Sequence, residues 1–212
     1  MKKLRGYKKN QCRARQFRIK KKGRTMLQSP FDFIPKHKQK NVFYYLLSLT
    51  ILVLLGMQIS GAPLKTDAAP LGIISFEFAG DLATSQTILT SWGITGRFYA
   101  ALNTGLDFLF LFSYACTFAL GCVLAARFFE GRSAVLSRIG VVMAWGQIAA
   151  GLFDAIENFA LIQMLIGTQS EIWPQVAFWF AAIKFILVGI GISYLHFSTA
   201  WFLAYFFARN RV

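Results

Sequence analysis

The sequence predicts an all-α, polytopic membrane protein in which four transmembrane helices form a left-handed bundle. The chain of 212 residues is 56% hydrophobic, yet its formal net charge is +14. Fifteen of its 23 lysine and arginine residues precede Val42, and after that point eight basic residues balance eight acidic ones. The charge is therefore confined to a tail and the apolar residues to a nearly neutral domain, as is typical of integral membrane proteins.

Residues 1–41 form a polybasic segment with too little apolar surface to fold alone, so we expect a disordered cytoplasmic tail. Juxtamembrane lysines and arginines contribute about 1 kcal/mol each near an anionic membrane surface, which makes anionic lipid headgroups its expected partner. Two alternatives together have the same weight as this lipid-surface role: an enlarged positive-inside signal, or a start at Met26 that leaves a short tail. No folded module or stacking motif supports sequence-specific nucleic-acid binding.

Four apolar runs follow the tail, and each is near or above the ~20 residues that cross a bilayer as a helix. The first contains no charge and is predicted to be an uncleaved anchor, because the basic region before it is too long for a signal peptide. Together the runs predict a transmembrane domain over residues 42–208, with spans at 42–60, 98–126, 139–166 and 176–208.

The orientation follows from the loops, because lysine and arginine are enriched on the cytoplasmic side. Arg127, Arg132 and Arg138 lie in or beside the loop between the second and third spans, whereas the other two connections contain only Lys65 and Arg97. Both termini are therefore predicted to be cytoplasmic. We expect the membrane to be a bacterial inner (plasma) membrane.

The external segment 61–97 is too long for a plain connection between packed helices. Apolar and polar residues alternate along it in a pattern that predicts one or two short amphipathic helices at the outer interface. Such a helix acts either as an interfacial spacer, which we favour, or as a lid over polar residues in the membrane.

Four ionisable residues interrupt the apolar spans: Asp107, Asp154, Glu157 and Lys184. An ionised side chain in the bilayer core costs at least about 2.5–3.5 kcal/mol on insertion scales, so such residues are usually paired or functional. Counted inward from the external ends at ~1.5 Å per residue, three of them lie roughly 12–14 Å deep and Asp154 lies one turn deeper. The sequence therefore predicts one cluster in the outer half of the membrane.

Polar and small residues recur at alternating intervals of three and four along the last three spans. Asn103, Asp107 and Tyr114 share one face of the second span, and Asp154 and Asn158 share one face of the third. Residues spaced in this way form the seam of a left-handed bundle, where polar groups can bond between helices. Asn103 and Asn158 therefore join the candidate site.

The cluster has more negative than positive groups. Lys184 can neutralise one carboxylate, with Glu157 and Asp107 as its expected partners and Asp154 as the group expected to be protonated. Otherwise a cation from outside must balance the charge, and Arg97 is a candidate external partner. The sequence has no calcium-loop spacing and no recognised catalytic or cofactor motif, so we expect no metal, cofactor or catalytic residue.

Four stretches carry a resemblance to a known type of protein: PLGIISFEFAG at 70–80, ILTSWG at 88–93, GLDFLF at 105–110 and DAIEN at 154–158. With these motifs, residues 42–208 resemble an uncharacterised family of bacterial four-span integral membrane proteins for which no activity is known. The resemblance implies the four-span fold. It also makes Glu77 a second candidate external partner of the cluster.

The expected function is binding of a ligand, lipid headgroup or proton at the carboxylate–lysine cluster. If the protein also transports its ligand, we expect a homodimer, because one four-helix bundle has little room for a pathway. The alternative is a structural or assembly subunit in which the cluster holds helices together. A lipid-modifying enzyme is a third hypothesis, weakened because the sequence offers no evident nucleophile or metal ligands. An enzyme is therefore the less favoured class.

Overall fold

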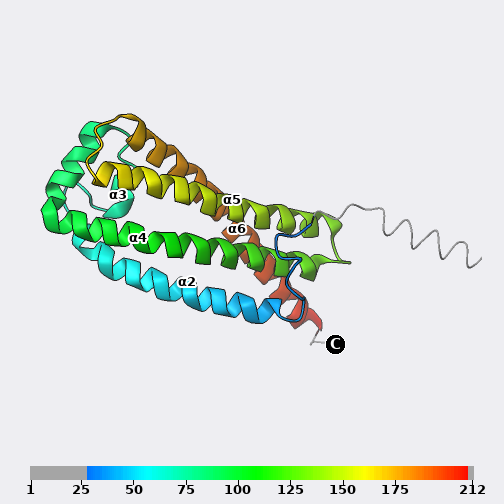
Figure 1. Cartoon of the computed structure of the whole chain (residues 1–212). Coiled ribbons are helices and arrows are strands. Elements are labelled where there is room, and N and C mark those ends of the chain that lie inside the picture. Colours follow the sequence, from blue (N-terminus) through cyan, green and yellow to red (C-terminus); the bar gives the residue numbers. More distant parts are fainter. Residues whose placement is uncertain (1–27, 210–212) are drawn as a thin grey trace, which may run out of the picture.

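The computed structural model describes residues 28–209 of the chain. Four long helices run side by side: α2 (Gln39–Gly61), α4 (Leu82–Phe129), α5 (Ala134–Leu165) and α6 (Ile172–Arg209) (Figure 1). The described residues contain no strand, and all four helices are long and apolar enough to cross a membrane. The predicted all-α, four-span class is confirmed, whereas most of the basic tail lies outside the described residues.

Helix α4 is the centre of the bundle, because it packs against each of the other three long helices. Helix α5 packs between α4 and α6, whereas α2 packs on α4 and makes no extensive contact with α5 or α6 within residues 28–209. Two polar contacts fasten α2 to α4. The hydroxyls of Thr50 and Thr117 lie 3.0 Å apart, and the Asn103 amide donates to the Met57 carbonyl and the Ser60 hydroxyl, both at 2.8 Å.

The second span differs from its predicted form, because α4 begins at Leu82 rather than near residue 98. Asp81 caps this helix by accepting a 2.7 Å hydrogen bond from the Thr84 amide. Gly93 then breaks the helix with φ 57° and ψ −162°, a conformation open almost only to glycine. Arg97 spans the break, since its Nε donates a 3.0 Å hydrogen bond to the Leu89 carbonyl.

The external segment contains the short helix α3 (Ile73–Glu77) and the three turns of α4 that precede the kink (Figure 1). Phe76 of α3 is fully buried and packs edge-on against Trp92, with the ring centroids 5.2 Å apart. The Trp92 indole donates a 2.8 Å hydrogen bond to the Leu64 carbonyl. The segment is therefore part of the folded bundle, and α3 is held in place at its external end.

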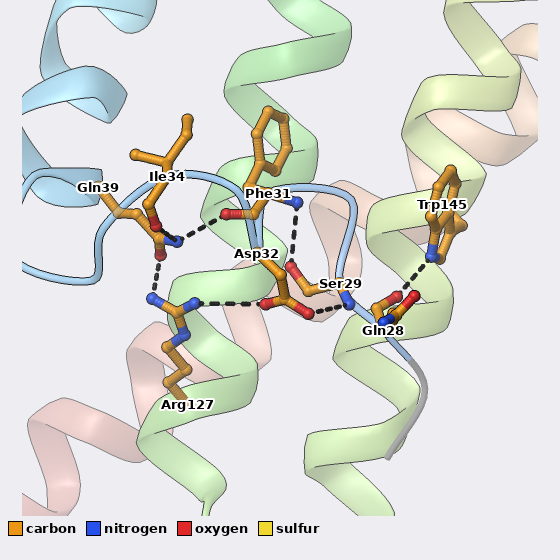
Figure 2. A network of polar contacts seen from close by, with 8 residues as sticks. All are labelled: Gln28, Ser29, Phe31, Asp32, Ile34, Gln39, Arg127 and Trp145. Carbon is orange, nitrogen blue, oxygen red and sulfur yellow. Dashed lines mark hydrogen bonds and ion pairs between the residues drawn. The ribbon is translucent and has the colours of Figure 1, made fainter. Parts of the chain in front are cut away.

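At the opposite end of the bundle, a polar network ties the chain before α2 to the neighbouring helices (Figure 2). The buried Gln39 amide donates to the carbonyls of Phe31 and Ile34, both at 3.0 Å, and its carbonyl oxygen accepts from Arg127. Arg127 also lies 3.8 Å from the Asp32 carboxylate. One arginine of the predicted cytoplasmic loop region therefore has a local structural role.

Candidate functional site

Lys184 of α6 is the centre of a buried ionic cluster. Its Nζ lies 2.7 Å from Glu157 Oε2 and 2.9 Å from Asp154 Oδ1, both on α5, and 3.8 Å from Glu77 Oε2 on α3. The exposed fractions of these four residues are between 0 and 6%. Three separate elements therefore place their charged side chains around one ammonium group.

Asp107 of α4 lies beside this cluster but has a different partner. Its Oδ2 accepts a 2.9 Å hydrogen bond from the side-chain amide of Asn158, and no lysine or arginine of the described residues forms an ion pair with it. Asp107 is 7% exposed and Asn158 is 1% exposed. The carboxyl group of Asp107 is therefore buried with a neutral partner.

The local sequence explains how the cluster is held. Asp154, Glu157 and Asn158 share one face of α5, because residues three and four apart in a helix are neighbours. Glu77 ends α3, and the next residue, Phe78, stacks on Phe185 with ring centroids 5.9 Å apart. Since Phe76 is buried on the other side of Glu77, the two aromatic anchors direct the Glu77 carboxyl into the bundle.

The structure brings together Asp107, Asp154, Glu157, Asn158 and Lys184 with Glu77, the candidate external partner. Lys184 pairs with Asp154 rather than with Asp107, which was its expected partner. Two candidate residues have other contacts: Asn103 fastens α2 to α4, and Arg97 bonds across the Gly93 kink. Neither forms a hydrogen bond or ion pair with the cluster among the described contacts.

The sequence estimate placed Asp107 roughly 12–14 Å inside the membrane. Asn103 bonds to Ser60 near the external end of α2, and Asp107 is one turn further along α4, about 6 Å deeper at ~1.5 Å per residue. The estimate counted from residue 98, although α2 ends level with Asn103. The cluster is still in the half of the bundle nearer α3.

A cavity of about 430 Å³ lies beside the cluster, between α2, α3, α4 and α6. Its polar wall comes from Asn103, Asp107, Tyr114, Glu77, Asp154 and Lys184, with Lys65 also on its lining. Apart from Gln58, its remaining wall is apolar and includes Leu54, Phe110, Phe118, Phe185 and Val188. The cavity therefore has a charged region that continues into an apolar cleft.

The cavity exists because α2 and α6 both contact α4 but do not pack closely against each other. Leu54 on α2 and Phe185 on α6 line it and are 40% and 45% exposed. In a membrane these exposed faces meet lipid, so the cleft opens sideways toward the bilayer. Sequence patterns did not reveal it, since hydropathy does not show which apolar helices pack together.

Tyr114 is a site residue whose role the sequence did not identify. It shares the polar face of α4 with Asp107 and lines the same cavity. Its side chain is 4% exposed, and its hydroxyl has no hydrogen-bond partner among the described residues. Tyr114 follows Asp107 by seven residues, and this spacing is the sequence signal that places both side chains on one face of the helix.

The cluster combines four carboxyl groups with one ammonium group, so it carries excess negative charge if all of them are ionised. Burial raises the pKa of Glu77 above its ordinary value, and the Lys184 ammonium opposes this effect only in part. Asp154, the group that the sequence predicted to be protonated, lies 2.9 Å from the Lys184 ammonium group.

Metal binding finds no support in this geometry. Within residues 28–209, no group of three or more histidine, cysteine, aspartate or glutamate side chains is placed to hold a metal ion. The carboxylates of the cluster instead surround a lysine.

No family model, curated protein or solved structure matches the chain. The resemblance to bacterial four-span membrane proteins therefore stays an expectation from the sequence. A functional assignment has to rest on the cluster and the cavity beside it.

Proposed function

We propose that this chain is an integral membrane protein that binds an amphiphilic ligand, such as a lipid, in the cleft between α2 and α6. The polar end of the ligand lies against the carboxylate–lysine cluster, and its apolar part lies along the cleft. The observation that carries the proposal is one cavity with buried charged residues in one region and aromatic and aliphatic side chains in the rest. Ligand sites are usually of this kind, largely apolar with a few placed polar groups.

The dimensions of the cavity support this assignment. Its volume of about 430 Å³ is within the common range for small-molecule sites, about 300–1,000 Å³. Its α4 lining extends from Asn103 to Phe118, which is about 22 Å at ~1.5 Å per residue. That length exceeds half of a ~30 Å hydrocarbon core and accommodates an apolar chain lying roughly along the membrane normal.

The basic loop pattern supports an orientation in which both termini are cytoplasmic. The cluster then lies in the outer leaflet of the membrane, which we propose to be a bacterial inner membrane. A ligand would enter sideways from that leaflet, with its polar end near the outer surface and its apolar end toward the midplane.

A structural role is the second candidate, and a specific observation favours it. Lys184 joins α3, α5 and α6 through three carboxylates, so the cluster also stabilises the packing of these elements. In that case the protein is an assembly subunit and the cavity has no ligand. Catalysis is not favoured, because no nucleophile with an adjacent base is evident in the cluster.

The two roles can be separated by filling the cleft without touching the charges. Val188 lines the cavity on α6, and Val142 of α5 is 47% exposed and does not line it. Lipids and small molecules that co-purify with wild type, Val188→Trp and Val142→Trp can be compared by mass spectrometry. We expect a species that wild type and Val142→Trp retain and Val188→Trp loses. Identical species in all three proteins would contradict ligand binding in this cleft.

A further inference from the structure

We infer that the polar end of the ligand is a cation, a protonated amine carried on an apolar chain, and that Asp107 and Glu77 bind it. This inference rests on the proposed function and adds the chemical class of the ligand. It depends on the distribution of charge along the cavity wall rather than on the presence of the cavity.

The positive charge that Lys184 brings to the cluster is already shared among three carboxylates. Lys184 lies closest to Glu157 and Asp154, at 2.7 and 2.9 Å, and Glu77 is further away at 3.8 Å. No other lysine or arginine of residues 28–209 forms an ion pair with these carboxylates. Lys65 lines the cavity but is an exposed residue.

Asp107 is the carboxyl group on the cavity wall that Lys184 does not pair with. One of its oxygens accepts a hydrogen bond from the neutral amide of Asn158, which supplies no positive charge. An ionised carboxylate in a low-dielectric site needs an opposite charge within a few ångströms to remain ionised. A cationic ligand in the adjacent cavity supplies that charge.

Two further buried groups on the same wall lack a hydrogen-bond donor, and both can accept a hydrogen bond from the N–H groups of a protonated amine. Glu77 Oε2 and the Tyr114 hydroxyl are without a hydrogen-bond partner among the described residues, although these side chains are only 6% and 4% exposed. Both residues line the cavity together with Asp107. Unpaired buried polar atoms are costly, and an N–H donor in the adjacent cavity would satisfy both of them.

The aromatic residues of the cavity strengthen the case for a cation. Phe110, Tyr114, Phe118 and Phe185 all contribute to its lining. Lys184 Nζ already lies 5.0 Å from the centroid of the Phe185 ring, so a positive charge is accommodated against this wall. Carboxylates combined with aromatic faces are the usual means of recognising ammonium groups.

Other headgroups fit the wall less well. An anionic headgroup would add to the negative excess, and a neutral alcohol would leave Asp107 without an opposite charge. A metal ion is disfavoured by the ligand geometry. Protons alone would also neutralise the carboxyl groups, so the experiment is designed to distinguish protonation from the binding of a cationic ligand.

The test uses three probes with the same twelve-carbon chain: dodecylammonium, dodecanol and dodecanoate. Each is added to the purified full chain in a bulky neutral detergent, and native mass spectrometry gives the fraction of protein that carries one probe molecule. We expect the ammonium probe to occupy at least ten-fold more protein than either of the others. We also expect Val188→Trp to abolish its binding and Val142→Trp to leave it unchanged.

Asp107→Asn and Glu77→Gln test the assigned residues, because both changes remove a charge and keep the shape of the side chain. Each should lower occupancy by the ammonium probe at least ten-fold, with thermal melting used to show that the variant is folded. If occupancy persists in both folded variants, the assignment of the cation site is wrong. If either variant does not fold, Tyr114→Phe gives the same comparison, with a smaller expected loss of about three-fold.

The outcomes also separate this inference from the proposed function. If dodecanol or dodecanoate binds as well as the ammonium probe, and Val188→Trp abolishes that binding, the cleft is a ligand site but the ligand is not a cation. Neutralisation by protons alone predicts this result for dodecanol. If no probe shows binding that Val188→Trp abolishes, both the cation inference and the ligand-binding proposal are wrong.

Discussion

The Asp107 carboxylate accepts a 2.9 Å hydrogen bond from the side-chain amide of Asn158, its neighbour across the α4–α5 interface. This arrangement fixes the orientation of Asp107 but leaves its charge uncompensated. The other carboxylates of the cluster contact Lys184, which holds them in the bundle. The cluster therefore has two parts, an ion-paired part that stabilises the fold and a carboxyl group on the cavity wall that is available to a ligand.

Asp107→Asn should stabilise the ligand-free protein. The substitution removes a charge that costs at least about 2.5 kcal/mol in the membrane core, and the Asn158 amide can still donate to the new side-chain oxygen. We expect the free energy of unfolding to rise by about 1 kcal/mol or more in detergent. A decrease of that size in an unfolding titration would show that Asp107 has a stabilising partner.

Lys184→Met should have the opposite effect, because it leaves three buried carboxylates without a cation. Breaking a buried ion pair from one side costs about 3–5 kcal/mol, so we expect a large fall in the melting temperature or loss of folded protein. The double variant Lys184→Met/Glu157→Gln should recover part of this loss. Lys65→Met, at an exposed position, is the control and should change the stability by less than about 0.5 kcal/mol. Equal effects of Lys184→Met and Lys65→Met would contradict the assigned ion pairs.

Gly93→Ala should destabilise the protein through backbone strain. The φ of 57° and ψ of −162° at Gly93 belong to a region that costs other residues of order 1–3 kcal/mol. Gly105→Ala is the matched control, since Gly105 lies in regular α4 helix with open space around it. There alanine should be neutral or stabilise by up to about 1 kcal/mol. Melting temperatures that move in the same direction for both variants would argue against the kink.

The predicted topology can be checked with single cysteines at exposed positions at the two ends of the bundle. Asp67 lies between α2 and α3, and Glu130 lies between α4 and α5. In a Cys12→Ser background, a membrane-impermeant thiol reagent added to intact cells should label Asp67→Cys. It should label Glu130→Cys only after the cells are opened. The reverse pattern would place both termini outside.

The sequence predicted the long helices and the ionic cluster because both depend on local information. Uninterrupted apolar runs identify spans whatever their neighbours are, and charged residues within them stand out individually. Helical spacing then places Asp154, Glu157 and Asn158 on one face without any knowledge of the fold. Lys184 was expected to join them because its estimated depth matched theirs.

Other features depend on tertiary contacts that the sequence pattern does not contain. The start of α4 at Leu82 was missed, because the turns before Gly93 are less apolar and the break resembles the end of a span. Arg97 was expected near the cluster, but its long side chain instead satisfies a carbonyl left free by the kink. The cleft between α2 and α6 follows from which helices pack together, and four apolar runs are compatible with several such arrangements.

The most direct test of ligand binding is a cryo-EM map of the wild-type protein purified with its native lipids and enlarged with a bound antibody fragment. Such a map shows both the packing of α2 against α6 and any molecule between them. We expect elongated density in the cleft, with its polar end at Asp107 and Glu77 and its other end near Phe118. A closed α2–α6 interface with no density beside Asp107 would contradict it.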